Sequence, residues 1–295
     1  MPEDALKLDP QARDLMVTTK VTCPFLGSLV HQELLGARGA ADNPLARIED
    51  VRRLGNAGGG DLGDLLVFFA TGNHAFMRNR SGNALDAATP AGLFSLELPG
   101  SQGSHPGHSG ILQGDPAALG SGRLSKADFD RLARLANNNF LKRSDVGRFI
   151  AQNLKRDPNS KVTLARVAEL LARDLAGVVE AISTTLTSKI FKSGGDTDNN
   201  HGLLERRLTK LLGEDNLVGS AGEFGLLFAF LSNDPETREI EGEPALLFEH
   251  VRAMFVDKRL PDGWQAWKKS RVDWVIHTTS LLLHADKEYR RLSTT

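Results

Sequence analysis

The chain has one cysteine, Cys23, which stands directly before Pro24 and an apolar run. A lone cysteine forms no internal disulfide bond, so its sulfur is a packing group, a nucleophile or a metal ligand. Pro24 suits the first position of a helix, because the N–H that proline lacks would be unpaired there anyway. The sequence therefore predicts Cys23 at a helix N-terminus, where free amides and the helix dipole stabilise a thiolate. The alternative is a small buried hydrophobic residue.

Glu223 is the second residue whose type and surroundings could do chemistry. It is the only charged residue in the apolar stretch 222–228. A carboxylate on such a helix costs free energy unless it is solvated, paired or protonated. One explanation is a position in the first turn of a helix, where the helix dipole favours an acidic side chain. The other explanation is a functional carboxylate.

Composition limits the classes of protein to which the chain can belong. With 295 residues, 40% of them hydrophobic, it can bury a substantial core. The net charge is -1, from 36 basic and 37 acidic residues, which argues against nucleic acid or an anionic membrane as the main partner. No apolar stretch approaches the ~20 residues of a membrane helix, and the N-terminus lacks the pattern of a signal peptide. We expect a soluble protein, cytoplasmic as given, or secreted if a leader was removed.

Helical periodicity dominates the rest of the chain, and strand signals are scarce. Ser125, with Asp128 three residues later, predicts a helix N-cap, and Ser144 is expected to cap the next helix through Leu154. Further helices are expected at residues 24–35, 61–77, 163–187, 201–212, 221–231, 244–258 and 270–285. The sequence shows no evident repeat. It predicts an all-α protein, folded as a single mostly helical domain over residues 1–295 with long loops.

Three stretches follow Cys23 and Pro24 along the chain in a characteristic order: residues 108–115 with 123–128, residues 222–228, and residues 250–264. In this order they resemble the chloroperoxidase and unspecific peroxygenase family of haem-thiolate enzymes, over residues 18–267 with the loops unmatched. The resemblance implies a fold around a buried haem b (iron protoporphyrin IX). It also implies that hydrogen peroxide is used to oxidise or oxygenate a small organic substrate.

The resemblance assigns a role to each candidate residue. Cys23 would be the proximal thiolate ligand of the haem iron, which donates electron density and favours O–O cleavage. Glu223 would be the distal acid–base group, which takes the first proton of the peroxide and returns it to the leaving oxygen. Family members support this glutamate with a histidine or an arginine. Gly114 and Asn216 occupy the two matching positions here, so the sequence does not identify the partner.

Two departures from the family concern a divalent cation beside a haem propionate. Gln113 stands where the family has a glutamate that helps to bind this ion, and Arg123 stands where a metal-binding serine would be. Because a carboxylate is lost and a fixed cation is gained, we expect Arg123 to replace the ion and to pair with the propionate. Two alternatives stay open: a solvated loop arginine, and a magnesium or calcium ion held by Asp115, Ser121 or backbone carbonyls.

The sequence therefore leaves three functions open. The first is a haem-thiolate enzyme that uses hydrogen peroxide: a peroxygenase, a peroxidase or a haloperoxidase. The second is a haem-binding protein on the same fold without efficient peroxide cleavage. The third is a helical interaction protein without a cofactor, in which Cys23 is a packing residue.

Overall fold

The computed structural model describes residues 5–21, 23–63, 65–66, 93–96, 124–156 and 216–294. The helices predicted at residues 163–187 and 201–212 lie outside these ranges, as does most of the helix predicted at residues 61–77. Gln113, Asp115 and Arg123 also lie outside them, so the site at the propionate stays a prediction. No helix within the described ranges is long and apolar enough to cross a membrane.

The prediction of an all-α fold is wrong, because the described residues mix helices with sheets. They contain eight α-helices and two three-stranded antiparallel sheets. One sheet has the order β1-β2-β3, from β1 (Arg38–Ala40), β2 (Asn43–Arg47) and β3 (Leu93–Ser95). The other has the order β4-β6-β5, from β4 (Phe140–Lys142), β5 (Arg238–Ile240) and β6 (Glu243–Leu247). Strands this short offer too few positions for an alternating pattern to stand out.

The hairpin of β5 and β6 shows why turn signals also failed. Its two turn residues, Glu241 and Gly242, have φ values of 55° and 76°. Positive φ at both central residues is what a type I′ turn requires, and Asn-Gly or Asp-Gly is its usual sequence. Here a glutamate takes the first position, and its carboxylate accepts a hydrogen bond of 2.5 Å from Lys142 of β4. The turn is therefore supported by a neighbouring strand that lies far away in the sequence.

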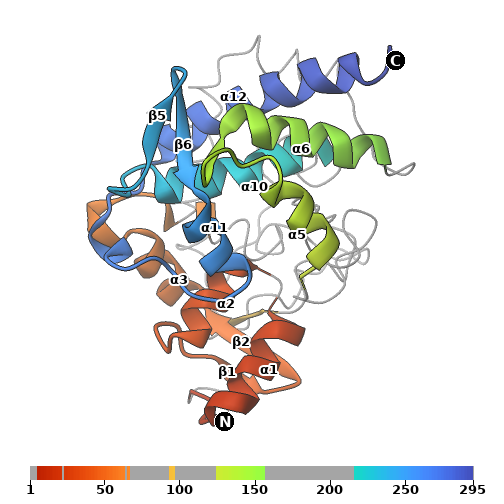
Figure 1. Ribbon diagram of the computed structural model, residues 1–295. Helices are drawn as coiled ribbons and strands as arrows, with labels where there is room; N and C mark the ends of the chain where they lie inside the picture. Colours follow the sequence, from red (N-terminus) through yellow and green to blue (C-terminus); the bar gives the residue numbers. More distant parts are fainter. Residues whose placement is uncertain are drawn as a thin grey trace, which may run out of the picture.

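Three helices pack together at one end of the molecule (Figure 1): α6 (Arg143–Arg156), α10 (Asn216–Leu231) and α12 (Arg271–Arg291). Two glycines allow their close approach. A Cβ atom at Gly147 would lie 2.5 Å from the Cβ of His284, and one at Gly225 would lie 2.1 Å from Thr278 Oγ1. A side chain at either position would push its helix away from α12. The contact at Gly225 sets the position of α10 against α12, and therefore the position of Glu223 on α10.

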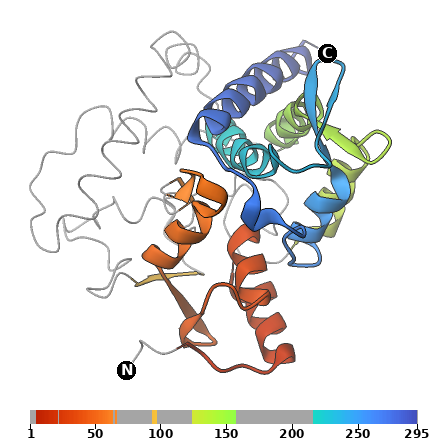
Figure 2. The same cartoon turned by 90° about the vertical axis from the view of Figure 1, so that its left-hand side faces the viewer.

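Five further helices and two short turns complete the described part of the chain. They are α1 (Pro10–Lys20), α2 (Pro24–His31), α3 (Ile48–Gly55), α5 (Lys126–Ala133) and α11 (Phe248–Phe255), with the short 3₁₀ turns η1 (Ala57–Gly59) and η2 (Trp264–Ala266). In Figures 1 and 2, α1 and the β1–β2 hairpin lie at the end opposite to α6, α10 and α12, with α2 and α11 between them.

Helix starts show where local sequence was sufficient. Ser125 is confirmed as the N-cap of α5, because its hydroxyl accepts from the Asp128 amide. Ser270 caps α12 in the same way, through the amide of Val272. The prediction for Ser144 is wrong, because α6 begins at Arg143 and the Ser144 amide donates to Glu243.

Four of the predicted helix ranges need correction. The helix predicted at residues 270–285 continues to Arg291. The helix predicted at residues 24–35 ends at His31, and the helix predicted at residues 221–231 begins at Asn216. The range 244–258 divides into β6 and α11.

One structural unit occurs twice, although no repeat was evident from the sequence. In each copy a helix precedes a hairpin with a two-residue turn, and the second strand runs directly into another helix: α2-β1-β2-α3 and α10-β5-β6-α11. Pro44 pairs with Gly39 as Pro244 pairs with Glu239, so the copies are offset by 200 residues. The residues identical at this offset are Leu26 and Leu226, Arg38 and Arg238, Pro44 and Pro244, Glu49 and Glu249, Val51 and Val251, and Arg52 and Arg252.

His277 of α12 is buried against Phe228 of α10, with ring centroids 5.4 Å apart. The Ser232 hydroxyl donates to the Phe228 carbonyl at 2.8 Å and so accepts from His277 Nε2 at 2.9 Å. His277 Nδ1 is buried and has no hydrogen-bond partner among the described residues, which suits an unprotonated nitrogen better than an N–H group. Burial, helped by the Arg143 guanidinium, lowers the pKa of His277 from 6.5 to about 4.

Mild acid is therefore expected to destabilise the fold through His277. Between these two pKa values the unfolded chain binds a proton that the folded chain does not, so the free energy of unfolding falls as the pH drops from about 6.5 towards 4. The loss is on the order of 3 kcal/mol. Urea unfolding at several pH values measures it. His277→Gln should remove this component, whereas His284→Gln on the same helix should retain it. An unchanged pH dependence in His277→Gln would contradict the prediction.

Candidate functional site

Cys23 is the N-cap residue of α2, as the sequence predicts. Its backbone is extended, Pro24 takes the first helical position, and the Cys23 carbonyl accepts the first helical bond from Gly27 at 2.8 Å. The sulfur is partly buried against the hydrophobic core. The amides of Phe25 and Leu26 act on it directly, because the first turn of a helix leaves these donors unpaired.

The thiol nevertheless stays protonated in the protein without a bound metal. Burial raises the pKa of Cys23 to about 11, and it outweighs the two amides, which lower the pKa. The helix end stabilises the thiolate in the predicted direction, but its effect is smaller than that of burial. Because the thiolate is the reactive form of cysteine, this raised pKa also argues against Cys23 as a nucleophile.

Glu223 lies on α10, in a position that excludes one explanation for it. The helix begins at Asn216 and has no acidic residue in its first turn, so Glu223 is not a helix-start glutamate. Its side chain is partly buried, and its carboxylate is close enough to the Cys23 sulfur to raise the pKa of the thiol. The two helices meet through Phe25 and Phe230, whose ring centroids lie 4.8 Å apart. Cys23 and Glu223 also occupy equivalent positions in the two copies of the repeated unit, 200 residues apart.

The segment after α11 holds α2 in place, a role that sequence reasoning missed. Ser28 of α2 donates to the Met254 carbonyl at 3.3 Å, and Gln32 accepts from the Leu260 amide at 2.9 Å. The Phe25 ring also packs edge-on against Trp264, with centroids 6.2 Å apart. The stretch 254–264, part of the sequence resemblance but without an assigned role, thus positions the helix that carries Cys23.

Two buried lysines belong to the same segment and had no signal in the sequence. Lys258 is 4% exposed, and its ammonium lowers the pKa of Cys23. Lys269 is fully buried and donates to the carbonyls of Trp264 and Trp267, both at 2.7 Å. Burial lowers the pKa of Lys269 to about 8. Close packing at Gly60, where a Cβ atom would lie 2.3 Å from the Lys269 carbonyl, joins this segment to the glycine-rich turn after α3.

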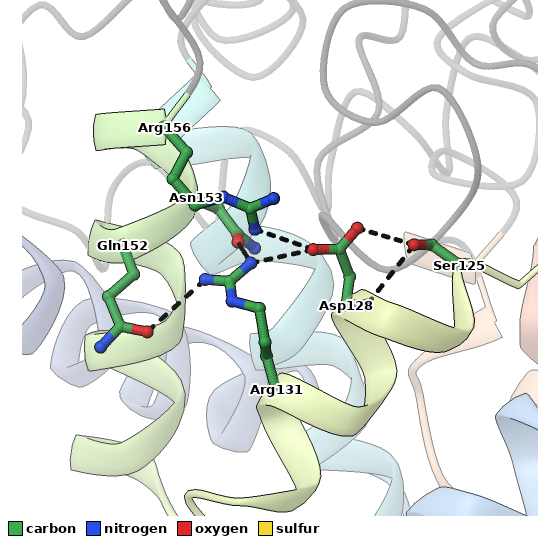
Figure 3. Close-up of polar contacts among 6 residues, drawn as sticks. All are labelled: Ser125, Asp128, Arg131, Gln152, Asn153 and Arg156. Carbon is green, nitrogen blue, oxygen red and sulfur yellow. Dashed lines mark hydrogen bonds and ion pairs between the residues drawn. The ribbon is translucent and has the colours of Figure 1, made fainter.

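Asp128 lies in the stretch that resembles the family's ion-binding segment. Its carboxylate is already paired with two arginines. Its Oδ1 accepts from Arg131 at 2.9 Å and from Arg156 at 2.8 Å, and its Oδ2 accepts from Ser125 at 2.7 Å (Figure 3). Arg131 also donates to Asn153 of α6 at 2.7 Å. The Asp128 carboxylate therefore links α5 to α6. Its negative charge, which a divalent cation would need, is already paired with two guanidinium groups.

The histidines near α10 that the structure describes are engaged elsewhere. His250 Nδ1 forms a hydrogen bond with the buried carboxylate of Asp234, and His277 forms one with the Ser232 hydroxyl. Neither contact involves Glu223. In the family that the sequence resembles, a histidine or an arginine supports this glutamate. The contacts of His250 and His277 do not identify such a partner among the described residues.

No protein-family model matches the chain, and neither does any curated protein or solved structure. Function is therefore inferred from the residues of this chain.

Proposed function

We propose that the chain is a haem-thiolate enzyme, a peroxidase or a peroxygenase, that uses hydrogen peroxide to oxidise or oxygenate a small organic substrate. One observation carries the proposal. The resemblance assigns Cys23 and Glu223 to the two sides of one haem, and these residues lie close enough to interact electrostatically although 200 residues separate them. A Glu223 side chain remote from Cys23 would have spoken against it.

The residues at the site suit haem better than a metal held by protein alone. Among the described residues, no three His, Cys, Asp or Glu side chains gather to hold a metal ion. A haem iron needs only an axial donor from the protein, and the sulfur of Cys23 offers one, with two amides facing it. The raised pKa of the free thiol is compatible with this role, because a metal ion deprotonates a thiol that coordinates it. When bound, haem with an axial thiolate supplies the chemistry that cleaves the O–O bond.

Glu223 would serve as the acid–base group of the reaction. Its carboxylate would accept the proton of hydrogen peroxide and then deliver it to the departing oxygen. The partial burial of its side chain on α10 limits access of water to this proton. The close packing of Gly225 on Thr278 would hold the carboxylate in place during the transfer.

The spectrum of the wild-type protein tests the proposal. Protein supplied with haem, reduced and exposed to carbon monoxide, should show the red-shifted Soret band of a thiolate-bound complex. Steady turnover of a peroxidase substrate with hydrogen peroxide should accompany it. Haem binding without turnover would indicate a haem-binding protein that does not cleave peroxide. Absence of haem binding would favour an interaction protein without a cofactor.

Arg123 is proposed to take the place of the divalent cation by pairing with a haem propionate. Arg123→Ala is expected to weaken haem binding on the order of tenfold, because a charge-assisted hydrogen bond contributes about 1.5–3 kcal/mol. Arg134→Ala, which alters an exposed arginine of the same region, should bind haem like the wild type. Haem titration and metal analysis of chelator-treated protein measure these effects. Stoichiometric magnesium or calcium beside the haem, or unaltered affinity in Arg123→Ala, would contradict the substitution of Arg123 for the ion.

A further inference from the structure

The ammonium of Lys269 lies in a cage of carbonyl groups and aromatic rings. Its Nζ atom donates to the carbonyls of Trp264 and Trp267, both at 2.7 Å, and to the Ala57 carbonyl at 3.4 Å. Three acceptors match the three donors of an ammonium group. The same atom lies over the Trp264 ring, 5.1 Å from its centroid, and over the Phe230 ring at 5.3 Å. Both distances are within the range of a cation–π contact.

The charge of Lys269 has no carboxylate partner among the described residues, although the residue is fully buried. Lysine is almost never buried to this degree unless its charge is paired. The Asp61 amide donates to the Lys269 carbonyl at 2.9 Å, but the Asp61 carboxylate accepts from Arg271. Carbonyl dipoles and ring faces therefore take the place of a counter-ion. An apolar side chain could fill the same volume, but it would leave the carbonyls of the cage without this donor.

The cage adjoins the contact between the helix of Cys23 and the helix of Glu223. Trp264 packs against Phe25 of α2, with ring centroids 6.2 Å apart, and against Phe230 of α10, with centroids 5.7 Å apart. Phe25 and Phe230 are themselves in contact, with centroids 4.8 Å apart. The ammonium holds the Trp264 backbone by a hydrogen bond and lies on the Phe230 ring. It therefore connects the tryptophan that lies against α2 directly to α10.

The backbone around the cage is equally close-packed. A Cβ atom at Gly58 would lie 2.2 Å from the Trp267 carbonyl, and one at Gly60 would lie 2.3 Å from the Lys269 carbonyl. The glycine-rich turn after α3 therefore lies backbone to backbone against the segment that forms the cage. This packing leaves Trp264 little freedom to move once the ammonium is in place.

We propose that Lys269 is a positioning residue: its ammonium, held by three carbonyls and two aromatic faces, fixes Trp264 against α2 and α10 and so sets the place of Cys23 relative to Glu223. The consequence for catalysis rests on the proposed function, in which these two residues act on opposite sides of one haem. The effect on α2 and α10 does not rest on it, because the contacts of the cage involve the protein alone.

Hydrogen exchange of the protein without haem tests the positioning directly. Lys269→Met keeps most of the side-chain volume and removes the charge. The amides of α2 and of the last turn of α10 should exchange about tenfold faster in this variant, because hydrogen bonds to charged groups are strong enough for such a factor. The amides that pair β4 with β6 serve as an internal reference and should exchange as in the wild type. A lysine that only stabilises the whole fold would speed exchange in that pair as well.

The reaction with hydrogen peroxide tests the consequence for catalysis. Haem-loaded Lys269→Met should keep the Soret band of a thiolate-bound complex, because Cys23 is still present as the ligand. It should react with peroxide about tenfold more slowly, because Glu223 is no longer held in the same place relative to Cys23. Stopped-flow mixing measures this rate.

Lys268→Met provides the matched control, because Lys268 is the exposed neighbour of Lys269. It should leave both measurements unchanged. Lys269→Gln, which keeps two N–H donors but no charge, replaces Lys269→Met if the latter does not fold.

The two measurements separate this role from the proposed function. Wild-type exchange of α2 in the uncharged variant, or equal acceleration in the pair of β4 and β6, refutes the positioning role of Lys269 and leaves the proposed function standing. Faster exchange of α2 with a wild-type peroxide rate refutes the consequence for catalysis alone. If the wild type does not bind haem through Cys23, the proposed function and that consequence fail together, whereas the exchange result still decides whether Lys269 positions α2.

Discussion

Cys23→Ala is expected to abolish the red-shifted Soret band of the reduced carbon monoxide complex. The sulfur is the only thiol of the chain, so no other cysteine can replace it as the iron ligand. Alanine provides no donor atom, and the first turn of α2 keeps Pro24 and its backbone bonds because the Cys23 side chain makes no capping hydrogen bond. The variant should therefore fold and lose the ligand alone.

Two comparisons make this result interpretable. His31→Gln alters the last residue of the same helix, at the end opposite to the sulfur, so it should keep the band. Circular dichroism of both variants checks that α2 and its surroundings remain folded. A thiolate-type spectrum that survives in Cys23→Ala would exclude Cys23 as the ligand and would leave it as a packing residue.

Glu223→Gln is expected to slow the reaction with hydrogen peroxide by about 10²–10⁴, the usual effect of losing one acid–base group. Glutamine has nearly the same shape as glutamate but cannot accept and return a proton. The spectrum of the haem complex should stay that of a thiolate-ligated protein, because Cys23 is untouched. Stopped-flow mixing of the haem-loaded protein with peroxide measures the rate.

An exposed glutamate of β5 offers a control for the loss of charge. Glu239→Gln removes the same charge far from Cys23 and should react like the wild type. Wild-type kinetics in Glu223→Gln would mean that this carboxylate does not move the proton. The haem-binding function would then remain without the proposed mechanism of peroxide cleavage.

Local signals in the sequence predicted the local structure of the site. Cys23 before Pro24 identified a helix start, and Ser125 identified another, because an N-cap depends on a few adjacent residues. Glu223 was also singled out correctly as an unusual residue on an apolar helix. Its place in the helix could not be predicted, because α10 begins five residues before the predicted start.

Contacts between distant segments could not be read in the same way. The strand β4 pairs with β6 across about 100 residues, so no short window contains both. The pKa of Cys23 depends on burial by several elements, and that burial reversed the effect expected from the helix end. Lys258 is one of many lysines in the sequence, and only the packing of the segment after α11 against α2 brings its side chain beside Gly27.

The repeated unit has a consequence for how the proposed site is divided. Cys23 and Glu223 stand at the same point of the two copies, but the helix is interrupted before Pro24 in the first copy and continuous through Glu223 in the second. The interruption frees the amides that face the sulfur, whereas the amides around Glu223 are used within α10. A ligand held between these copies would meet an electron donor on one side and a proton carrier on the other. The difference between the two sides of the site would thus originate in one interruption of a helix, between Lys20 and Pro24, which the other copy of the repeated unit lacks.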